Sequence, residues 1–318
     1  MPEALAIAPL RPCHAEALTA LWLRQFQRFL ADSPVYPFWA EAPQTVASII
    51  AARAEKAQGV IALQNGAPAG FMAYETFSFH GADSAFIPFT GHAAPGGARE
   101  AAYWHMYRAL AERWVADGIK SHYITCAFGD DETVKTFFDL GFGAYVGDAF
   151  ARPRPYGPGA DGGVAVRRAQ AADVESLCSL VRKTGPFYAG SPIFLTREEY
   201  PPERVAALVA HGRVLLALCG GRPAGFLNLS VYEGPDGPAL RRKGFGTIDE
   251  IGAYLLPEYR NRGVGRRLVY AAFALCVAEG IPCVHVDYET ANGYANRFWP
   301  KYFSPTLLSL RRAVHADR

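Results

Sequence analysis

The chain has 318 residues, of which 50% are hydrophobic and 19% are charged, a composition that excludes disordered and collagen-like proteins. Its 32 basic and 30 acidic residues nearly balance, so we expect no nucleic-acid partner. The longest apolar stretch, Leu268 to Ala278, is much shorter than the about 20 residues that cross a membrane. The N-terminus lacks a signal-peptide pattern and the six cysteines form no CxxC pair. These features predict a cytoplasmic protein without membrane or metal partners.

Four short segments occur twice in the same order, about 160 residues apart. The pairs are Ser33–Tyr36 with Ser191–Phe194, Val60–Phe71 with Val214–Phe226, Val115–Ile119 with Val277–Ile281, and Asp131–Phe142 with Asn292–Phe303. This spacing is too long for a solenoid repeat and indicates a duplicated domain. A Pro- and Gly-rich stretch at 153–163 reads as a linker. We therefore predict one domain over residues 1–152 and a second over 164–318.

Both halves show the same order of predicted elements. A strand leads into an amphipathic helix, a Pro- and aromatic-rich stretch, a second helix and a hairpin; a strand, a long helix, a strand, a short helix and a last strand follow. The first strand covers 6–10 or 164–168, the first helix 14–29 or 173–183, the hairpin turns at Gly66-Ala67 or Gly220-Gly221, and the long helix ends at Gly118 or Gly280. On the first long helix, one apolar stripe comprises Tyr103, Met106, Tyr107, Leu110 and Trp114. This alternation predicts an α/β (α+β) fold, with a mixed sheet flanked by helices in each half.

The most informative segment for function runs from Ile248 to Gly280. A strand predicted over Ile251–Leu256 is followed by Arg260-Asn261-Arg262-Gly263-Val264-Gly265 and then by a helix. Glycines at a strand-to-helix turn let the backbone approach an anion, and the N–H groups of the first helical turn can bind a phosphate. The third glycine of a dinucleotide fingerprint and the GK[ST] of a Walker loop are both missing, so neither of those sites is predicted.

This segment resembles the acyl-CoA loop of GNAT-type N-acetyltransferases. Pro257, Arg260, Gly263 and Gly265 fit P-x-x-[QR]-x-x-G-x-[GA], and Asn292-x-x-Ala295-x-x-Phe298-Trp299 is similar to a second element of that family. The resemblance covers most of 164–318 and extends weakly to the first half. It implies tandem GNAT-like domains with partly splayed sheets. Mycothiol synthase has a similar two-domain layout, although no motif ties this chain to its substrate.

The resemblance also implies a reaction and a cofactor site. An acetyl group would pass directly from acetyl-CoA to a primary amine of a small molecule or peptide, without a metal. Backbone groups at Leu255 and Leu256 would pair with the pantetheine arm, and the loop would hold the pyrophosphate. The remaining cofactor-binding residues that the resemblance implies are Arg260, Arg262, Gly263, Val264, Gly265, Arg266, Asn292 and Phe298.

Glu250 is the candidate base, because an extended strand would place it on one face with Gly252 and Tyr254. An ion pair with a nearby arginine is the competing interpretation. The tyrosine that the family commonly uses as acid corresponds to Trp299, so the acid stays unassigned, with Tyr302 as one candidate. Aromatic residues that could line the acceptor pocket, or pack in the core, are Phe187, Tyr188, Phe194 and Tyr254.

The first half lacks the loop. Aligned with an offset of 162, Arg260, Gly263 and Gly265 correspond to Ala98, Ala101 and Tyr103, so we expect a degenerate domain that does not bind the cofactor. Two other functions remain open: a non-catalytic acyl-CoA sensor, and an aminoacyl-tRNA-dependent transferase of the same fold, which the low net charge disfavours. The protein is expected to be a monomer or a homodimer.

Overall fold

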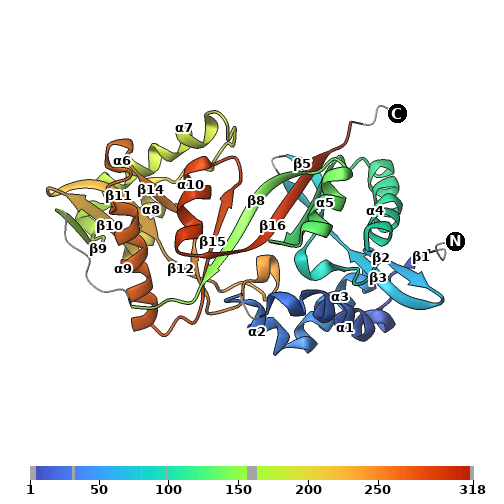
Figure 1. Cartoon of the computed structure of the whole chain (residues 1–318). Coiled ribbons are helices and arrows are strands. Elements are labelled where there is room, and N and C mark those ends of the chain that lie inside the picture. The colour runs from blue at the N-terminus through green and yellow to red at the C-terminus, as the bar shows by residue number, and fades with distance from the viewer. Residues whose placement is uncertain (1–4, 31–32, 80, 98, 156–162, 316–318) are drawn as a thin grey trace. The chain divides into compact units, whose positions relative to one another are not determined.

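The computed structural model describes residues 5–30, 33–79, 81–97, 99–155 and 163–315 (Figure 1). The chain forms two compact units. Unit 1 comprises Met1–Asp148, Pro235–Arg241 and Pro305–Arg318, whereas unit 2 comprises Ala149–Gly234 and Arg242–Ser304. These bounds differ from the expected domains, 1–152 and 164–318, because each unit includes segments from the other half of the sequence. Most of the expected linker lies outside the described residues.

Unit 1 contains two sets of paired strands. One is an antiparallel sheet in the order β1-β2-β3-β6, and in the other β7 pairs parallel with β5, which pairs antiparallel with β4. The strands are β1 (Ala6–Pro9), β2 (Gly59–Gln64), β3 (Ala67–Ala73), β4 (Glu75–Phe79), β5 (Ala82–Ile87), β6 (His92–Ala93) and β7 (Ser121–Ala127). The helices are α1 (Ala15–Phe26), α2 (Tyr36–Ala40), α3 (Pro43–Glu55), α4 (Arg99–Ala116) and α5 (Asp131–Asp139). The strand β8 (Gly143–Ala151) ends in unit 2.

Unit 2 also contains two sets of strands, and the chain passes from one to the other between β13 and β14. One antiparallel sheet has the order β14-β11-β10-β9, while β13 pairs antiparallel with β12 and parallel with β15. The strands are β9 (Val164–Arg168), β10 (Val214–Cys219), β11 (Arg222–Asn228), β12 (Ser230–Val231), β13 (Gly246–Ile248), β14 (Ala253–Leu255) and β15 (Val284–Glu289). The helices are α6 (Val174–Arg182), α7 (Thr184–Ala189), α8 (Pro202–Ala210), α9 (Val264–Ala278) and α10 (Gly293–Phe298). The expected splayed sheet is therefore confirmed.

The two faces of β10 belong to different apolar cores. Leu215 and Ala217 pack in a core with α9, and Val214 and Leu216 pack in a second core with α6 and α8. This alternation follows from the period of two along a strand. Helices thus cover both faces of this sheet (Figure 1).

The two hairpins share one geometry. Asn65-Gly66 joins β2 to β3 and Gly220-Gly221 joins β10 to β11, and all four residues have positive φ, as tight hairpin turns require. Both pairs also have a register shift in the same place, after Ala62 or Ala217. The predicted turn of the second hairpin is confirmed, and that of the first lies one residue earlier than expected.

The long helices also follow the sequence. The stripe on α4 is buried, with Tyr103, Met106 and Trp114 fully inaccessible and Tyr107 and Leu110 at most 3% exposed. Helix α4 stops at Ala116 and α9 at Ala278, two residues before glycines with positive φ. These glycines end the helices as predicted.

The strand β16 (Ser304–Ala313), from Pro305 onward, is part of unit 1. It pairs antiparallel with β7, from Leu307 opposite Ala127 to Ala313 opposite Ser121. The carbonyl of Thr306 accepts hydrogen bonds from the Tyr36 hydroxyl at 3.1 Å and from the Phe128 N–H at 2.8 Å. Residues from the end of the sequence therefore complete the core of the unit that contains its beginning.

Candidate active site

A cavity of about 810 Å³ lies in unit 2. Its walls come from β14, β15, the loop before α9, and the helices α7 and α10. One group of lining residues is basic and glycine-rich, and another is acidic and aromatic. The first group is Arg260, Arg262, Gly263, Gly265, Arg266 and Lys301, and the second is Phe187, Tyr188, Asp249, Glu250, Tyr254, Asp287, Glu289 and Tyr294.

The loop before α9 has the geometry that the sequence predicts. Gly263 caps the helix with a φ of 78°, a conformation that glycine adopts without strain. A Cβ on Gly265 would lie 2.9 Å from Cε2 of Phe298, so only glycine fits between the helix and that ring. The first turn of the 15-residue α9 therefore begins at the cavity, with Arg266 beside it. This arrangement can bind an anionic group through backbone N–H groups.

Arg260 lies across the edge of β14. Its Nε donates a hydrogen bond to the carbonyl oxygen of Leu255 at 3.2 Å. Its guanidinium carbon lies 4.6 Å from the ring centre of Tyr294, 5.3 Å from that of Phe187 and 5.8 Å from that of Tyr254, within the range of cation–π attraction. The other edge of β14 is paired with β11. Arg260 thus binds a backbone oxygen that the family resemblance assigns to the pantetheine arm.

Glu250 is not on a strand, which corrects the sequence interpretation. Residues 249–252 form a turn between β13 and β14, and Glu250 has a φ of 58°. Its Oε2 is 2.7 Å from Nη2 of Arg204, and its carbonyl accepts a hydrogen bond from Arg197 at 3.1 Å. Glu250 still lines the cavity, although its carboxylate is in the ion pair that the sequence left as the alternative.

Glu289, at the end of β15, is a second carboxylate in the cavity that the sequence analysis missed. Burial raises its pKa above 4.5, and the neighbouring charge of Asp287 raises it further. Nearby, burial and the charge of Glu289 raise the pKa of Tyr188 to about 12. A carboxylate with a raised pKa is a stronger proton acceptor. Its only sequence signal is its position, three residues before the predicted Asn292.

The other predicted site residues have mixed outcomes. Asn292 is buried and caps α10 by accepting a hydrogen bond from the Ala295 N–H at 3.2 Å. Trp299 packs in the core against Phe298, with ring centres 4.9 Å apart. Phe194 is 74% exposed and is absent from the cavity walls, so its assignment to the pocket is wrong. The predicted residues that line the cavity are Phe187, Tyr188, Glu250, Tyr254, Leu255, Arg260, Arg262, Gly263, Gly265, Arg266, Asn292, Phe298 and Tyr302.

Unit 1 has a counterpart of Arg260 that the sequence alignment missed. Arg99 donates from Nε to the carbonyl of Ala94 at 3.0 Å, again across five residues and from the edge of the corresponding sheet. The expected equivalent, Ala98, lies outside the described residues. Arg99 is the first residue of α4, whereas Arg260 precedes α9 by four residues. An extra helical turn in unit 1 thus replaces the glycine loop.

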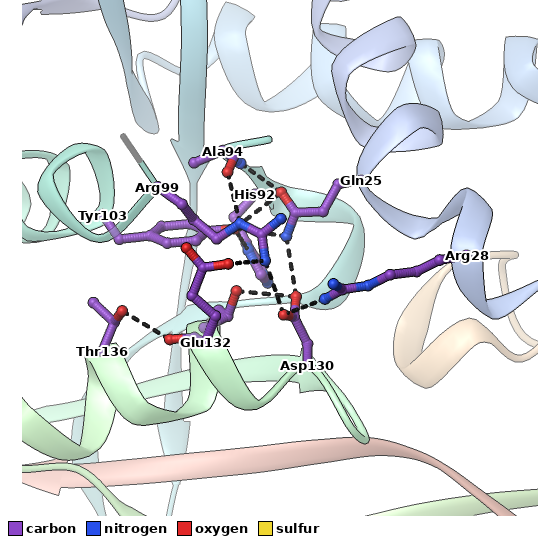
Figure 2. Close-up of polar contacts among 10 residues, drawn as sticks. Gln25, Arg28, His92, Ala94, Arg99, Tyr103, Asp130, Glu132 and Thr136 are labelled. Atoms are coloured by element: carbon purple, nitrogen blue, oxygen red, sulfur yellow. Dashed lines mark hydrogen bonds and ion pairs between the residues drawn. The ribbon is translucent and has the colours of Figure 1, made fainter. Parts of the chain in front are cut away.

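Arg99 is held by a buried carboxylate (Figure 2). Asp130 is at the N-cap position of α5, although its side chain makes no capping hydrogen bond. Its side chain is 1% exposed and lies 3.0 Å from Nη1 of Arg99 and 2.6 Å from Nη2 of Arg28. Gln25 and Thr133 donate to its other oxygen at 3.4 and 3.0 Å. Asp130, rather than the expected Asp131, therefore occupies the helix-capping position that Asn292 has in unit 2.

Nearby, His92 is fully buried between the Tyr103 hydroxyl and the Thr125 carbonyl, at 2.8 and 2.9 Å. Burial lowers the pKa of His92 from 6.5 to about 4. Within the described ranges, no group of three His, Cys, Asp or Glu residues could hold a metal ion. The helices described there also include none with the length and apolarity of a membrane span.

Comparison with known proteins identifies the segment that contains the cavity. Residues 177–303 match the acetyltransferase (GNAT) family. This segment is a GNAT-family domain. It covers most of unit 2 and includes both the glycine loop and Asn292. No curated protein matches the chain.

Solved structures share the GNAT fold over the whole chain. A GCN5-related N-acetyltransferase from Sphaerobacter thermophilus has a TM-score of 0.58 at 14% identity, covering 100% of this chain and 98% of that one. A region described as a GCN5-related glucosamine N-acetyltransferase, in a fungal multi-domain GH3 β-N-acetylglucosaminidase, has a TM-score of 0.54 at 14% identity, covering 98% of this chain and 38% of that one. At such identities the likeness shows the fold. The tandem GNAT-like fold predicted from the sequence is confirmed.

Proposed function

We propose that this protein is an acetyl-CoA-dependent N-acyltransferase that acetylates a primary amine of a small molecule or peptide. The observation that carries the proposal is the cavity of unit 2, where a glycine-flanked helix N-terminus and a carboxylate with a raised pKa face one space. Its six free cysteines fit a cytoplasmic location. A monomer or homodimer without nucleic-acid or membrane partners stays our expectation.

The residues present fit acetyl-CoA. Backbone groups from Arg262 to Arg266 would hold the pyrophosphate, because the first turn of α9 follows Gly263 and presents its N–H groups at the cavity. When bound, acetyl-CoA supplies a thioester that an amine can attack. Asn292 and Phe298 would line the opposite wall.

The acceptor amine must lose a proton before it attacks. We propose Glu289 as the group that accepts it, since burial makes this carboxylate more basic than an exposed one. Glu250 is the second candidate, although its contact with Arg204 occupies one of its oxygens. Tyr302, which lines the cavity, remains a candidate acid.

An assay of CoA release with a panel of primary amines tests the proposed reaction. Glu289→Gln should lower kcat about 10²–10⁴-fold, as loss of a general base does, with little change in acetyl-CoA affinity. The acid limb of the wild-type pH profile should lie above pH 4.5, because Glu289 must be ionised, and should disappear in the variant. Glu203→Gln, at an exposed position of α8 outside the cavity walls, is the matched control.

Two results would change the assignment. If Glu250→Gln rather than Glu289→Gln removes the acid limb, Glu250 is the base. A buried Trp299 at the family's acid position favours one alternative, a sensor that binds acyl-CoA without turnover. Binding of acetyl-CoA with no CoA release for any amine would support that sensor and reject the proposed transfer.

A further inference from the structure

Two equivalent arginines close the sheet edges of units 1 and 2, but different partners hold them. Arg99 and Arg260 each donate from Nε to a carbonyl five residues earlier, at 3.0 and 3.2 Å. The Ala94 carbonyl comes one residue after Ala93, which pairs with Phe71 of β3. The Leu255 carbonyl likewise comes one residue after Tyr254, which pairs with Phe226 of β11. The two contacts are therefore the same contact in the two copies of the fold.

The two arginines differ in the other groups that they contact. Arg99 is 8% exposed and forms ion pairs at 3.0 Å with both Asp130 and Glu132 (Figure 2). Asn292 occupies the N-cap position equivalent to that of Asp130. It is neutral and its Oδ1 accepts from the Ala295 N–H, whereas the Asp130 side chain makes no capping hydrogen bond and binds the arginine instead. Arg260 has aromatic rings as its other neighbours. A buried charge pair holds an arginine much more strongly than cation–π contacts at a partly exposed site.

We propose that the helix-cap residue, Asn292 in unit 2 and Asp130 in unit 1, determines whether the edge arginine can release the sheet edge for acyl-CoA. This inference rests on the proposed function, because it concerns the same cofactor. In unit 2, Arg260 leaves the carbonyl of Leu255, which then becomes available to the pantetheine arm. In unit 1, the charge of Asp130 keeps Arg99 on Ala94, so that the edge stays closed.

The physical basis is a competition for one acceptor. An edge strand offers its outward carbonyl to an added chain, and in unit 2 that of Leu255 is already bound by Arg260. An incoming diphosphate attracts the guanidinium because phosphate and arginine form charge-assisted hydrogen bonds. A carboxylate at position 292 would oppose this movement by attracting the same guanidinium in the closed position.

The test introduces the cap of unit 1 into unit 2 of the full-length protein. Asn292→Asp should slow the association of acetyl-CoA about tenfold or more, measured by stopped-flow fluorescence. One added charge-assisted hydrogen bond to Arg260 would lower the population of the released arginine by about a factor of ten. The same substitution in an Arg260→Met background should have little effect on the association rate. Ala291→Asp, which adds an equal charge at the exposed neighbouring residue, controls for simple repulsion of the anionic cofactor.

Each outcome decides the matter. An Asn292→Asp effect that persists undiminished in the Arg260→Met background, or that Ala291→Asp reproduces, would overturn the inference, since repulsion alone would explain it. Circular dichroism of every variant checks folding, and Asn292→Ser, a neutral variant at the same position, separates the loss of the asparagine side chain from the added charge; Asn292→Asp should slow association further than Asn292→Ser does. If the wild type binds no acetyl-CoA at all, the proposed function fails. If it binds acetyl-CoA but Asn292→Asp has the same effect on the association rate with and without Arg260→Met, only this inference fails.

Discussion

Replacing Asp130 by asparagine should destabilise unit 1 strongly. The carboxylate is 1% exposed and accepts from Arg28, Arg99, Gln25 and Thr133. Its loss leaves Arg99, 8% exposed, with Glu132 as a half-exposed partner at 3.0 Å. Breaking a buried ion pair costs about 3–5 kcal/mol. Because Glu132 keeps part of the compensation, we expect about 3 kcal/mol, the lower end of that range.

Arg28→Ala is the matched comparison. Arg28 approaches the same oxygen at 2.6 Å, but its side chain is 51% exposed, so its removal should cost about 1 kcal/mol or less. Urea unfolding followed by tryptophan fluorescence measures both, since Trp22, Trp39 and Trp114 are buried in unit 1. In Arg99→Met protein the cost of Asp130→Asn should shrink, because no unpaired guanidinium remains. Equal costs for Asp130→Asn and Arg28→Ala would refute the reasoning.

Two further predictions concern cofactor stoichiometry and acid stability. Calorimetry should give about one acetyl-CoA per chain, and Gly265→Leu should abolish binding, because even its Cβ would lie 2.9 Å from Phe298; two equivalent sites would contradict the assignment to unit 2. Because burial lowers the pKa of His92 to about 4, the unfolded chain binds more protons between pH 4 and 6.5. Stability should therefore fall by roughly 3 kcal/mol as the pH falls through that window. His92→Gln should reduce this dependence in urea titrations, and His122, whose pKa burial also lowers to about 4, should supply the part that remains. The exposed His105→Gln should leave the dependence unchanged; equal slopes for the His92 and His105 variants would show that His92 is not a source.

Local sequence patterns predicted the elements whose geometry depends on local chemistry. The Gly220-Gly221 turn, the glycine loop at Gly263 and the buried stripe on α4 each depend on residues close together in the sequence. The break at 249–252 was not predicted, because Ile248 to Leu256 has the apolar content of one strand and a positive φ at Glu250 has no sequence signal. The pairing of β16 with β7 was missed because a strand does not encode which edge it joins. Contacts across 31 and 102 residues join Arg99 and Arg28 to Asp130, so no local pattern revealed them.

The position of β16 has a consequence for the order in which the protein can fold during its synthesis. Most of unit 1 precedes β16 in the sequence and is translated before it, yet one edge of β7 lacks its partner β16 until residue 313 has been translated. Until then, β7, whose residues are all buried in the folded protein, would present an unpaired edge. Other chains can join an edge of this kind. A nascent first half should therefore depend on chaperones or remain partly unfolded while the second half is made. An expression fragment that ends at residue 152 should aggregate for the same reason, and adding a peptide of residues 304–315 in trans should reduce that aggregation.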